Sequence, residues 1–198
     1  MAFAAGDRSL MRSENLAGLE ATYRSLVDSL AGVPLKTEVC FGTGGAEPKV
    51  VFVLGLPHGS HPLDEEGQGK FEQLCQAMRL QPDEVYITTI IKTLTLATRP
   101  PHPADTRRDR PWITRQLELL APQMIVAFGP KVGAILTQDG VEHNTPGAVS
   151  SCDVDIATLS IPVHTTHEFS VLTQRGRDDQ RAKEMWSHLQ EVMKAVGL

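Results

Sequence analysis

The sequence predicts an α/β protein, a three-layer α/β/α sandwich around a central, mostly parallel four-stranded sheet. Short apolar runs rich in β-branched residues recur along the chain, and none is long enough to span a membrane. Amphipathic segments with helical spacing lie between these runs. Within the runs apolar and polar residues do not alternate, which is typical of parallel strands that are buried on both faces.

The length and composition favour one domain. The chain has 198 residues, 41% of them hydrophobic, which is enough for a substantial core. We expect residues 1–36 to supply an N-terminal segment and a packing helix to the same domain, whose main part is residues 37–198. The net charge of −5 excludes the global basic field of a strong non-specific DNA binder, so DNA contact would need a local basic patch.

The cysteines indicate a reducing environment. Cys40, Cys75 and Cys152 are widely spaced and form no CxxC motif, which supports neither a disulfide framework nor a four-cysteine metal site. The N-terminus lacks the long apolar core of a signal peptide. We therefore expect a cytoplasmic protein with reduced cysteines and no membrane-spanning segment.

The first half of the chain alternates helical and extended patterns. Residues 14–31 place apolar side chains at helical spacing, which predicts a packing helix. Residues 37–45 predict a short strand followed by glycines, and the unbroken apolar run at 50–54 predicts the first central strand. Core spacing over 65–78 predicts the next helix, which leads to a second buried strand at 83–91.

A long Pro- and Thr-rich loop follows the second strand, and a helix is expected from 105 to 120. Pro111 lies two residues past Asp109, so Asp109 is expected to cap a restarted helix. The apolar run at 123–128 predicts the third central strand.

The last third of the chain completes the alternation. Gly129-Pro130 is expected to start a helix that continues to residue 136, and the polar residues 137–155 are expected to form a loop. Residues 160–165 predict a fourth strand. The strongly amphipathic pattern of residues 178–196 predicts the final helix.

Three loops follow carboxyl ends of the predicted strands: GLPHGSHP, KTLTLATRPPHP and THEFSVL. In open α/β sheets ligands bind outside these ends, so we expect one site where the loops converge. The side chains at that edge that could bind a ligand or take part in catalysis are His58, His61, Thr89, Lys92, Arg99, His102, His167 and Glu168.

The chain contains, in this order, the blocks TEVCFGTGG, VVFVLGLPHG, PLDEEGQGKFEQL, EVYITTIIKTLTLATRPPHP, RPWITRQLELLAPQMIVAFG and THEFSVL. In order and spacing these blocks resemble the motifs of the uracil-DNA glycosylase superfamily, closest to its iron–sulfur branch, family four. The resemblance covers residues 37 to 196. It implies the fold of that superfamily and an activity in which a base is flipped into a pocket and excised.

Carried over position by position, the resemblance implies an altered pocket. Leu56 stands at the position of the acidic residue of the first motif, and Leu63 at that of the phenylalanine that stacks on uracil. Thr89 stands at the position of the asparagine that reads the uracil edge, although a hydroxyl cannot supply the paired donor and acceptor of an amide. The implied base pocket consists of Gly55, Leu56, Pro57, Leu63 and Thr89.

The cofactor of the family is not expected here. Thr93 and Asp109 stand at two positions of the cluster cysteines, and the two N-terminal cysteines of the family have no counterpart. Oxygen ligands and the lack of a CxxC motif argue against an iron–sulfur cluster, and no other cofactor is indicated. A zinc site made of His58, His61 and His167 is an alternative, although no carboxylate or cysteine has a compelling ligand spacing.

The retained catalytic candidate is His167, which the resemblance places near the scissile bond, and His58 and Asp64 are further candidates. Residues expected to contact DNA are Lys92, Arg99, Arg107, Arg108 and Ser170. The alternative is that the arginine-rich helix is a solvated face whose arginines pair with Asp105 and Asp109.

Three functional hypotheses remain open. The favoured one is a DNA-associated superfamily protein of base-excision repair or replication that has lost or strongly altered uracil excision. It is favoured because the acidic residue, the stacking phenylalanine and the base-reading asparagine of the family are all replaced. The second is an active, divergent glycosylase that hydrolyses the N-glycosidic bond of a deaminated or damaged base. The third is a non-catalytic subunit that binds a replication or repair protein. The oligomeric state is open in all three.

Overall fold

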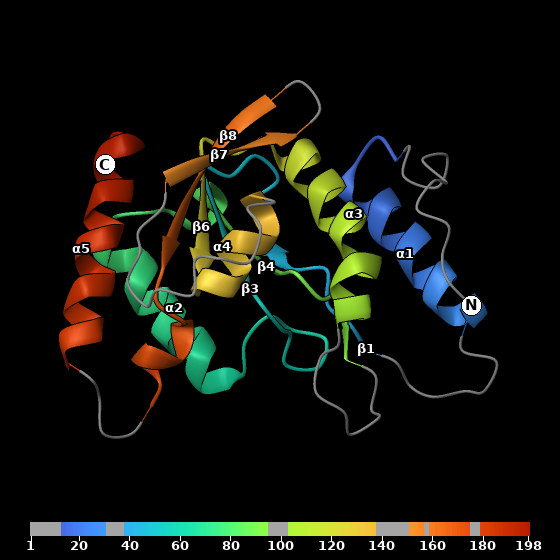
Figure 1. The fold of residues 1–198 in the computed structure, drawn as a ribbon, viewed down its shortest axis with the longest axis horizontal. Coiled ribbons are helices and arrows are strands. Elements are labelled where there is room, and N and C mark those ends of the chain that lie inside the picture. Colours follow the sequence, from blue (N-terminus) through green and yellow to red (C-terminus); the bar gives the residue numbers. More distant parts are fainter. Residues whose placement is uncertain (1–12, 31–37, 95–102, 138–150, 157–158, 175–178) are drawn as a thin grey trace.

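The computed structural model describes residues 13–30, 38–94, 103–137, 151–156, 159–174 and 179–198 (Figure 1). Its elements, in chain order, are α1 (Leu16–Leu30), β1 (Glu38–Val39), β2 (Thr43–Gly44), β3 (Val50–Leu54), α2 (Glu65–Ala77), the 3₁₀ helix η1 (Pro82–Glu84), β4 (Val85–Thr89), β5 (Thr93–Leu94), α3 (Pro103–Leu120), β6 (Met124–Phe128), α4 (Pro130–Thr137), β7 (Ser151–Ile156), β8 (Leu159–Thr166), the 3₁₀ helix η2 (Phe169–Leu172) and α5 (Asp179–Ala195). Among the described residues, no helix combines the length and apolarity that crossing a membrane requires.

The central sheet has six strands rather than the predicted four, in the order β2-β4-β3-β6-β8-β7. Its four middle strands, β4, β3, β6 and β8, run parallel to one another, which confirms the predicted parallel core. The strands β2 and β7 add an antiparallel edge on either side. A separate pair, β1 and β5, forms a small antiparallel sheet.

The strand β7 corrects the sequence prediction, which assigned residues 137–155 to a loop. Ser151–Ile156 pairs with β8 along its whole length. Its sequence, SCDVDI, alternates polar and apolar residues, which is the pattern of an edge strand with one solvated face. Two aspartates in six residues made that strand look like a polar loop.

Two helical layers cover the sheet, as the all-apolar run of β3 predicts. Val50, Phe52 and Leu54 belong to a core cluster that includes side chains of α2 and α5. Val51 and Val53 belong to a second cluster that includes side chains of α3 and α4. Figure 1 shows α2 and α5 on one side of the sheet and α3 on the other, with α1 outside α3. The three-layer architecture is therefore confirmed.

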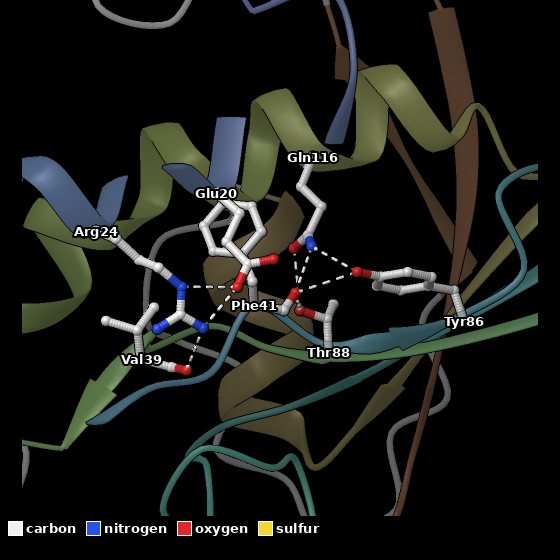
Figure 2. Close-up of polar contacts among 7 residues, drawn as sticks. All are labelled: Glu20, Arg24, Val39, Phe41, Tyr86, Thr88 and Gln116. Atoms are coloured by element: carbon white, nitrogen blue, oxygen red, sulfur yellow. Dashed lines mark hydrogen bonds and ion pairs between the residues drawn. The ribbon is translucent and has the colours of Figure 1, made fainter. Parts of the chain in front are cut away.

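Helix α1 packs against α3 through an aromatic contact. The ring centroids of Tyr23 and Trp112 lie 5.0 Å apart in an edge-to-face arrangement. Leu19 is fully buried in the same cluster. Arg24 of α1 also donates a 3.3 Å hydrogen bond to the carbonyl of Val39 (Figure 2), which ties α1 to β1.

Helix α3 runs without interruption through Pro111, so the prediction that Asp109 caps a restarted helix is wrong. The helix begins at Pro103, two residues earlier than expected. Asp109 then lies in its interior with a fully buried side chain. Burial of Asp109 and Trp112 holds the helix together across the proline, whose missing N–H alone favours a break.

Candidate functional site

A cavity of about 670 Å³ opens at the carboxyl edge of the parallel strands. Residues that follow β3, β4, β6 and β8 line it, among them Gly55, Ile90, Gly129 and Glu168. The described parts of the loops therefore meet at one edge, as the parallel topology predicts. The volume lies within the range of small-molecule sites, roughly 300–1,000 Å³.

One wall of the cavity is apolar and aromatic. Phe128, the last residue of β6, and Phe169, the first of η2, line it and pack edge to face with centroids 5.2 Å apart. Phe52 stacks behind Phe128 at 5.7 Å. Sequence reasoning missed both lining rings because it assigned apolar residues to the core. The available signal was their position at strand ends, where core residues border the site.

The polar residues that line the cavity are His58, Asp64, Thr106, Lys131, Glu168, Ser170 and Thr173. They include carboxylates, hydroxyls, an imidazole and an ammonium group. No side-chain amide is among the lining residues that the structure describes. Of the base-pocket residues expected from the sequence, Gly55, Leu56, Pro57 and Leu63 line the cavity, and Thr89 does not.

A narrow turn presents the two loop histidines. The backbone N–H of His58 donates to the carbonyl of His61 at 2.7 Å, and the reverse bond is 3.2 Å long. Gly59 closes the turn with a φ of +65°, and a Cβ there would lie 2.5 Å from a carboxylate oxygen of Glu38. Both histidines are exposed, and His58 lines the cavity. The sequence Leu56 to His61 therefore places an imidazole at the rim.

Asp64 has a structural task at the same rim. Its side chain accepts a 2.8 Å hydrogen bond from the N–H of Gly67 and so caps the N-terminus of α2. Glu65 and Glu66 add acidic residues in the first turn, which the helix dipole favours. Because Asp64 also lines the cavity, its carboxylate is held in a fixed position beside it.

His167 faces α5 and is not among the residues that line the cavity. Its Nε2 lies 2.9 Å from a carboxylate oxygen of Glu184, and its ring stacks on His188 with centroids 5.7 Å apart. Hydrogen bonds from Gln180 and His167 lower the pKa of the Glu184 carboxyl. The candidates His58 and Asp64 are thus brought together at the cavity, whereas His167 is engaged by a neighbouring helix.

Lys92 requires a correction, because its fully buried side chain cannot contact a DNA phosphate. Its Nζ donates to the Oγ1 of Thr88 at 2.7 Å and to the Oε1 of Gln116 at 2.6 Å. Figure 2 shows Thr88, Gln116 and Tyr86 gathered around the carbonyl oxygen of Phe41. Lys92 is therefore part of a buried polar network between β4 and α3.

Thr89 is likewise committed elsewhere. Its side chain is fully buried, and its hydroxyl donates a 2.7 Å hydrogen bond to the carbonyl of Ile91. The expectation that Thr89 lines the base pocket is not met in this structure, because the local backbone takes up its hydroxyl group.

The remaining cations divide into paired and exposed ones. Arg108 is paired with Asp109, its Nε lying 2.6 Å from the carboxylate, which matches the alternative of a paired arginine face. Arg107 is exposed. Arg99 and His102 lie outside the described residues. Lys131 is exposed at the cavity rim and makes no ion pair with another described residue. Sequence reasoning missed Lys131, although it follows the carboxyl end of β6 by only three residues.

The zinc alternative gains no support from the part of the chain that the structure describes. No group of three or more His, Cys, Asp or Glu side chains there could hold a metal ion. His58 and His61 lie on the cavity loop, while His167 contacts α5.

The fold and the cavity define an α/β protein with a ligand site at the carboxyl edge of its sheet. Residues 41–190 match the family model of the uracil DNA glycosylase superfamily, and the chain belongs to that superfamily. It is similar to the type-4 uracil-DNA glycosylase of Archaeoglobus fulgidus, with 29% identity over 99 residues, 48% of this chain and 50% of that protein. The chain spans about half the length of this curated relative. The inferred superfamily and the relation to its family-four branch are confirmed.

Proposed function

We propose that this DNA glycosylase-like protein is DNA-associated, works in base-excision repair or replication, and has lost or strongly altered ordinary uracil excision. One observation carries the proposal. The cavity has no side-chain amide among its described lining residues, and Leu56 and Leu63 line it where the resemblance implies an acid and an aromatic ring. Leu56 is 41% exposed, and its side chain has no polar group to offer.

The chemistry of excision explains why this lining matters. A glycosylase that flips a base must read the edge of the base and stabilise charge as the base leaves. A side-chain amide supplies a donor and an acceptor side by side, which a hydroxyl cannot. Thr89, which stands at the position of the base-reading asparagine, donates its hydroxyl to the carbonyl of Ile91. A uracil in the cavity would find no side-chain amide among the described lining residues, so its selective excision is expected to be very weak.

The first alternative is an active glycosylase with a different base. It is favoured by His58, Asp64 and Glu168, which line the cavity. Carboxylates can stabilise a cationic sugar, and an imidazole can transfer protons. Phe128 and Phe169 border the cavity, but both rings are buried in the core beneath it. The substrate class would be a deaminated or damaged base, released by hydrolysis of the N-glycosidic bond.

The second alternative is a non-catalytic subunit that binds a protein of replication or repair. It rests on the general observation that one fold serves many functions. Its distinguishing result would be the absence of both base excision and DNA binding.

The test is a panel of single- and double-stranded oligonucleotides that each carry one uracil, one other deaminated base or one oxidised base. We expect no uracil release above that of a sample without protein. Robust uracil release that His167→Ala abolishes would contradict the proposed loss of activity.

Two isosteric variants test the first alternative. Asp64→Asn removes the charge but keeps an efficient N-cap for α2, and Glu168→Gln removes the other carboxylate of the cavity. Release of a base other than uracil, abolished by either variant without a change in thermal unfolding, would establish an active divergent glycosylase.

A further inference from the structure

The family-four branch that this chain resembles implies an iron–sulfur cluster. Whether this chain could hold one depends on the residues at the positions of the cluster ligands. Clusters of this kind are held by cysteine thiolates. At two of the implied positions the chain has Thr93 and Asp109, which offer a hydroxyl and a carboxylate. The residues at these two positions therefore do not fit the group.

The two cysteines whose side chains the structure describes do not compensate. Burial raises the pKa of the Cys40 thiol and raises that of Cys75 to about 12. A cluster ligand must be a thiolate, and such cysteines normally lie in surroundings that lower the pKa. Cys75 also belongs to α2, on the opposite face of the sheet from α3.

A guanidinium group joins the two positions instead. Arg108 donates from Nε and Nη2 to the two carboxylate oxygens of Asp109, at 2.6 and 2.8 Å. The same Nη2 lies 2.7 Å from the Oγ1 of Thr93. Arg108 thus connects the side chains that stand where the resemblance implies metal ligands.

Two further donors complete the environment of Asp109. The hydroxyl of Tyr23 donates to Oδ1 at 2.7 Å, and the backbone N–H of Lys92 donates to Oδ2 at 2.8 Å. Each carboxylate oxygen therefore accepts one bond from Arg108 and one from another element. Asp109 and Tyr23 are fully buried, and a buried carboxylate is tolerated only when it is paired and hydrogen-bonded in this way.

We propose that this network of Arg108, Asp109, Thr93 and Tyr23 replaces the iron–sulfur cluster of the family-four branch, and that the protein binds no such cluster. The network joins α1, the segment of Lys92 and Thr93, and α3. It also links β5 to α3 through Thr93 and Asp109. The first turns of α3 include Thr106, which lines the cavity. The inference rests on the family relationship and on these contacts, and is independent of the proposed function.

The first arm of the test is an attempt to load the full chain. The protein is purified without oxygen, incubated with ferrous iron, sulfide and a reductant, and desalted. We expect a colourless protein with iron and sulfide far below one atom per chain. Stoichiometric iron and sulfide with visible charge-transfer absorbance would overturn the proposal, whether or not Asp109→Ala removes that absorbance.

The second arm measures whether the network performs a structural task. Arg108→Met leaves the buried carboxylate of Asp109 without its charge partner, and we expect the midpoint of thermal unfolding to fall by roughly 10 °C. Tyr23→Phe removes a single hydrogen bond and is expected to lower the midpoint by roughly 3 °C. The matched control is Arg107→Met, which alters an exposed arginine one residue away and should leave the midpoint within about 1 °C of the parent's.

Tyr23→Phe keeps the test decisive if Arg108→Met does not fold. Failure of Arg108→Met to fold while Arg107→Met folds normally would itself support the network. Equal midpoints for Arg108→Met, Tyr23→Phe and Arg107→Met would overturn the structural task. A midpoint of the parent protein that falls when an iron chelator is added would overturn the replacement of the cluster.

Discussion

Lys92 is a buried amine whose side-chain hydrogen-bond partners are neutral. Its amino group donates to Thr88 and Gln116 and lies 5.2 Å from the centroid of the Phe41 ring. Burial lowers the pKa of Lys92 to about 7, against an ordinary value of 10.5. Desolvation therefore destabilises the charged amino group by more than these neutral partners and more distant negative groups stabilise it.

The pH dependence of stability follows from this difference. Between about pH 7 and 10.5 the unfolded chain binds a proton at Lys92 that the folded chain does not hold. The free energy of unfolding therefore rises with pH across this window, and the penalty from Lys92 is fully present below it. Lys92→Met, which removes the titrating group, is expected to flatten this rise.

The measurement is thermal unfolding at pH values from 6 to 10, with the exposed Lys131→Met as the matched control. The control should keep the slope of the parent protein. Parallel curves for Lys92→Met and the parent would show that Lys92 remains charged in the folded state.

Single charged residues were also where the sequence was least informative. Lys92 and Asp109 are both fully buried, although charged residues are almost never buried unless they are paired. Arg108, the charge partner of Asp109, is its neighbour in the sequence, but the further partners Tyr23 and Gln116 lie on distant segments. No local pattern carries that information, so Lys92 was expected at a DNA phosphate and Asp109 at a helix cap.

At the scale of elements, α4 packs against β8 at a glycine. A Cβ added at Gly133 would lie 2.2 Å from the Oγ1 of Thr165 and 3.1 Å from its Cβ. The intrinsic preference of a helix for alanine, about 1 kcal/mol, is therefore outweighed by overpacking, which costs about 1–3 kcal/mol. Gly133→Ala is expected to lower the free energy of unfolding by about 1 kcal/mol in denaturant titrations.

A matched substitution isolates the packing term. Gly69 lies inside α2, and a Cβ added there would meet nothing beyond the backbone of its own helix within 4 Å. Gly69→Ala should therefore stabilise the protein by about 0.5–1 kcal/mol. The double change Gly133→Ala with Thr165→Ala should recover part of the loss. Equal effects of Gly133→Ala and Gly69→Ala would contradict the close approach of α4 to β8.

Elements with a strong periodic signal were predicted well. The apolar run of β3 predicted burial on both faces, because its residues alternate between the α2/α5 cluster and the α3/α4 cluster. Elements whose identity depends on a partner were predicted poorly. Ser151–Ile156 becomes a strand through its pairing with β8, and α3 passes Pro111 because its buried face is held by the sheet and α1.

For the whole molecule, the location of the site followed from topology, while its lining did not. Parallel strands bring their carboxyl ends to one edge, so residues 55–64 and 167–170 could be expected near one another. Which side chains face the cavity depends on the exact course of each loop. His167 turns to Glu184 of α5, and Phe128, Phe169 and Lys131 enter the set of functional candidates only through the structure.

The charge of the whole molecule shapes the last prediction, which concerns DNA affinity. A net charge of −5 means that any attraction to DNA must come from local cations and must weaken with salt. Arg107 and Lys131 are exposed, and neither forms an ion pair with another described residue. Affinity falls as salt rises, and we expect Arg107→Ala or Lys131→Ala to make the plot of log affinity against log salt less steep by roughly one unit.

Fluorescence anisotropy with a labelled duplex and a labelled single strand at several salt concentrations measures that slope. Lys194→Ala is the control, since it removes the same charge from an exposed position in the last turn of α5. All three variants lose one positive charge and so lose the same amount of non-specific attraction. Only contacts of Arg107 or Lys131 with DNA phosphates should make their salt dependence differ from that of this control. Equal slopes for all three variants would remove Arg107 and Lys131 from the interface, and undetectable binding by the parent protein would favour the protein-binding alternative.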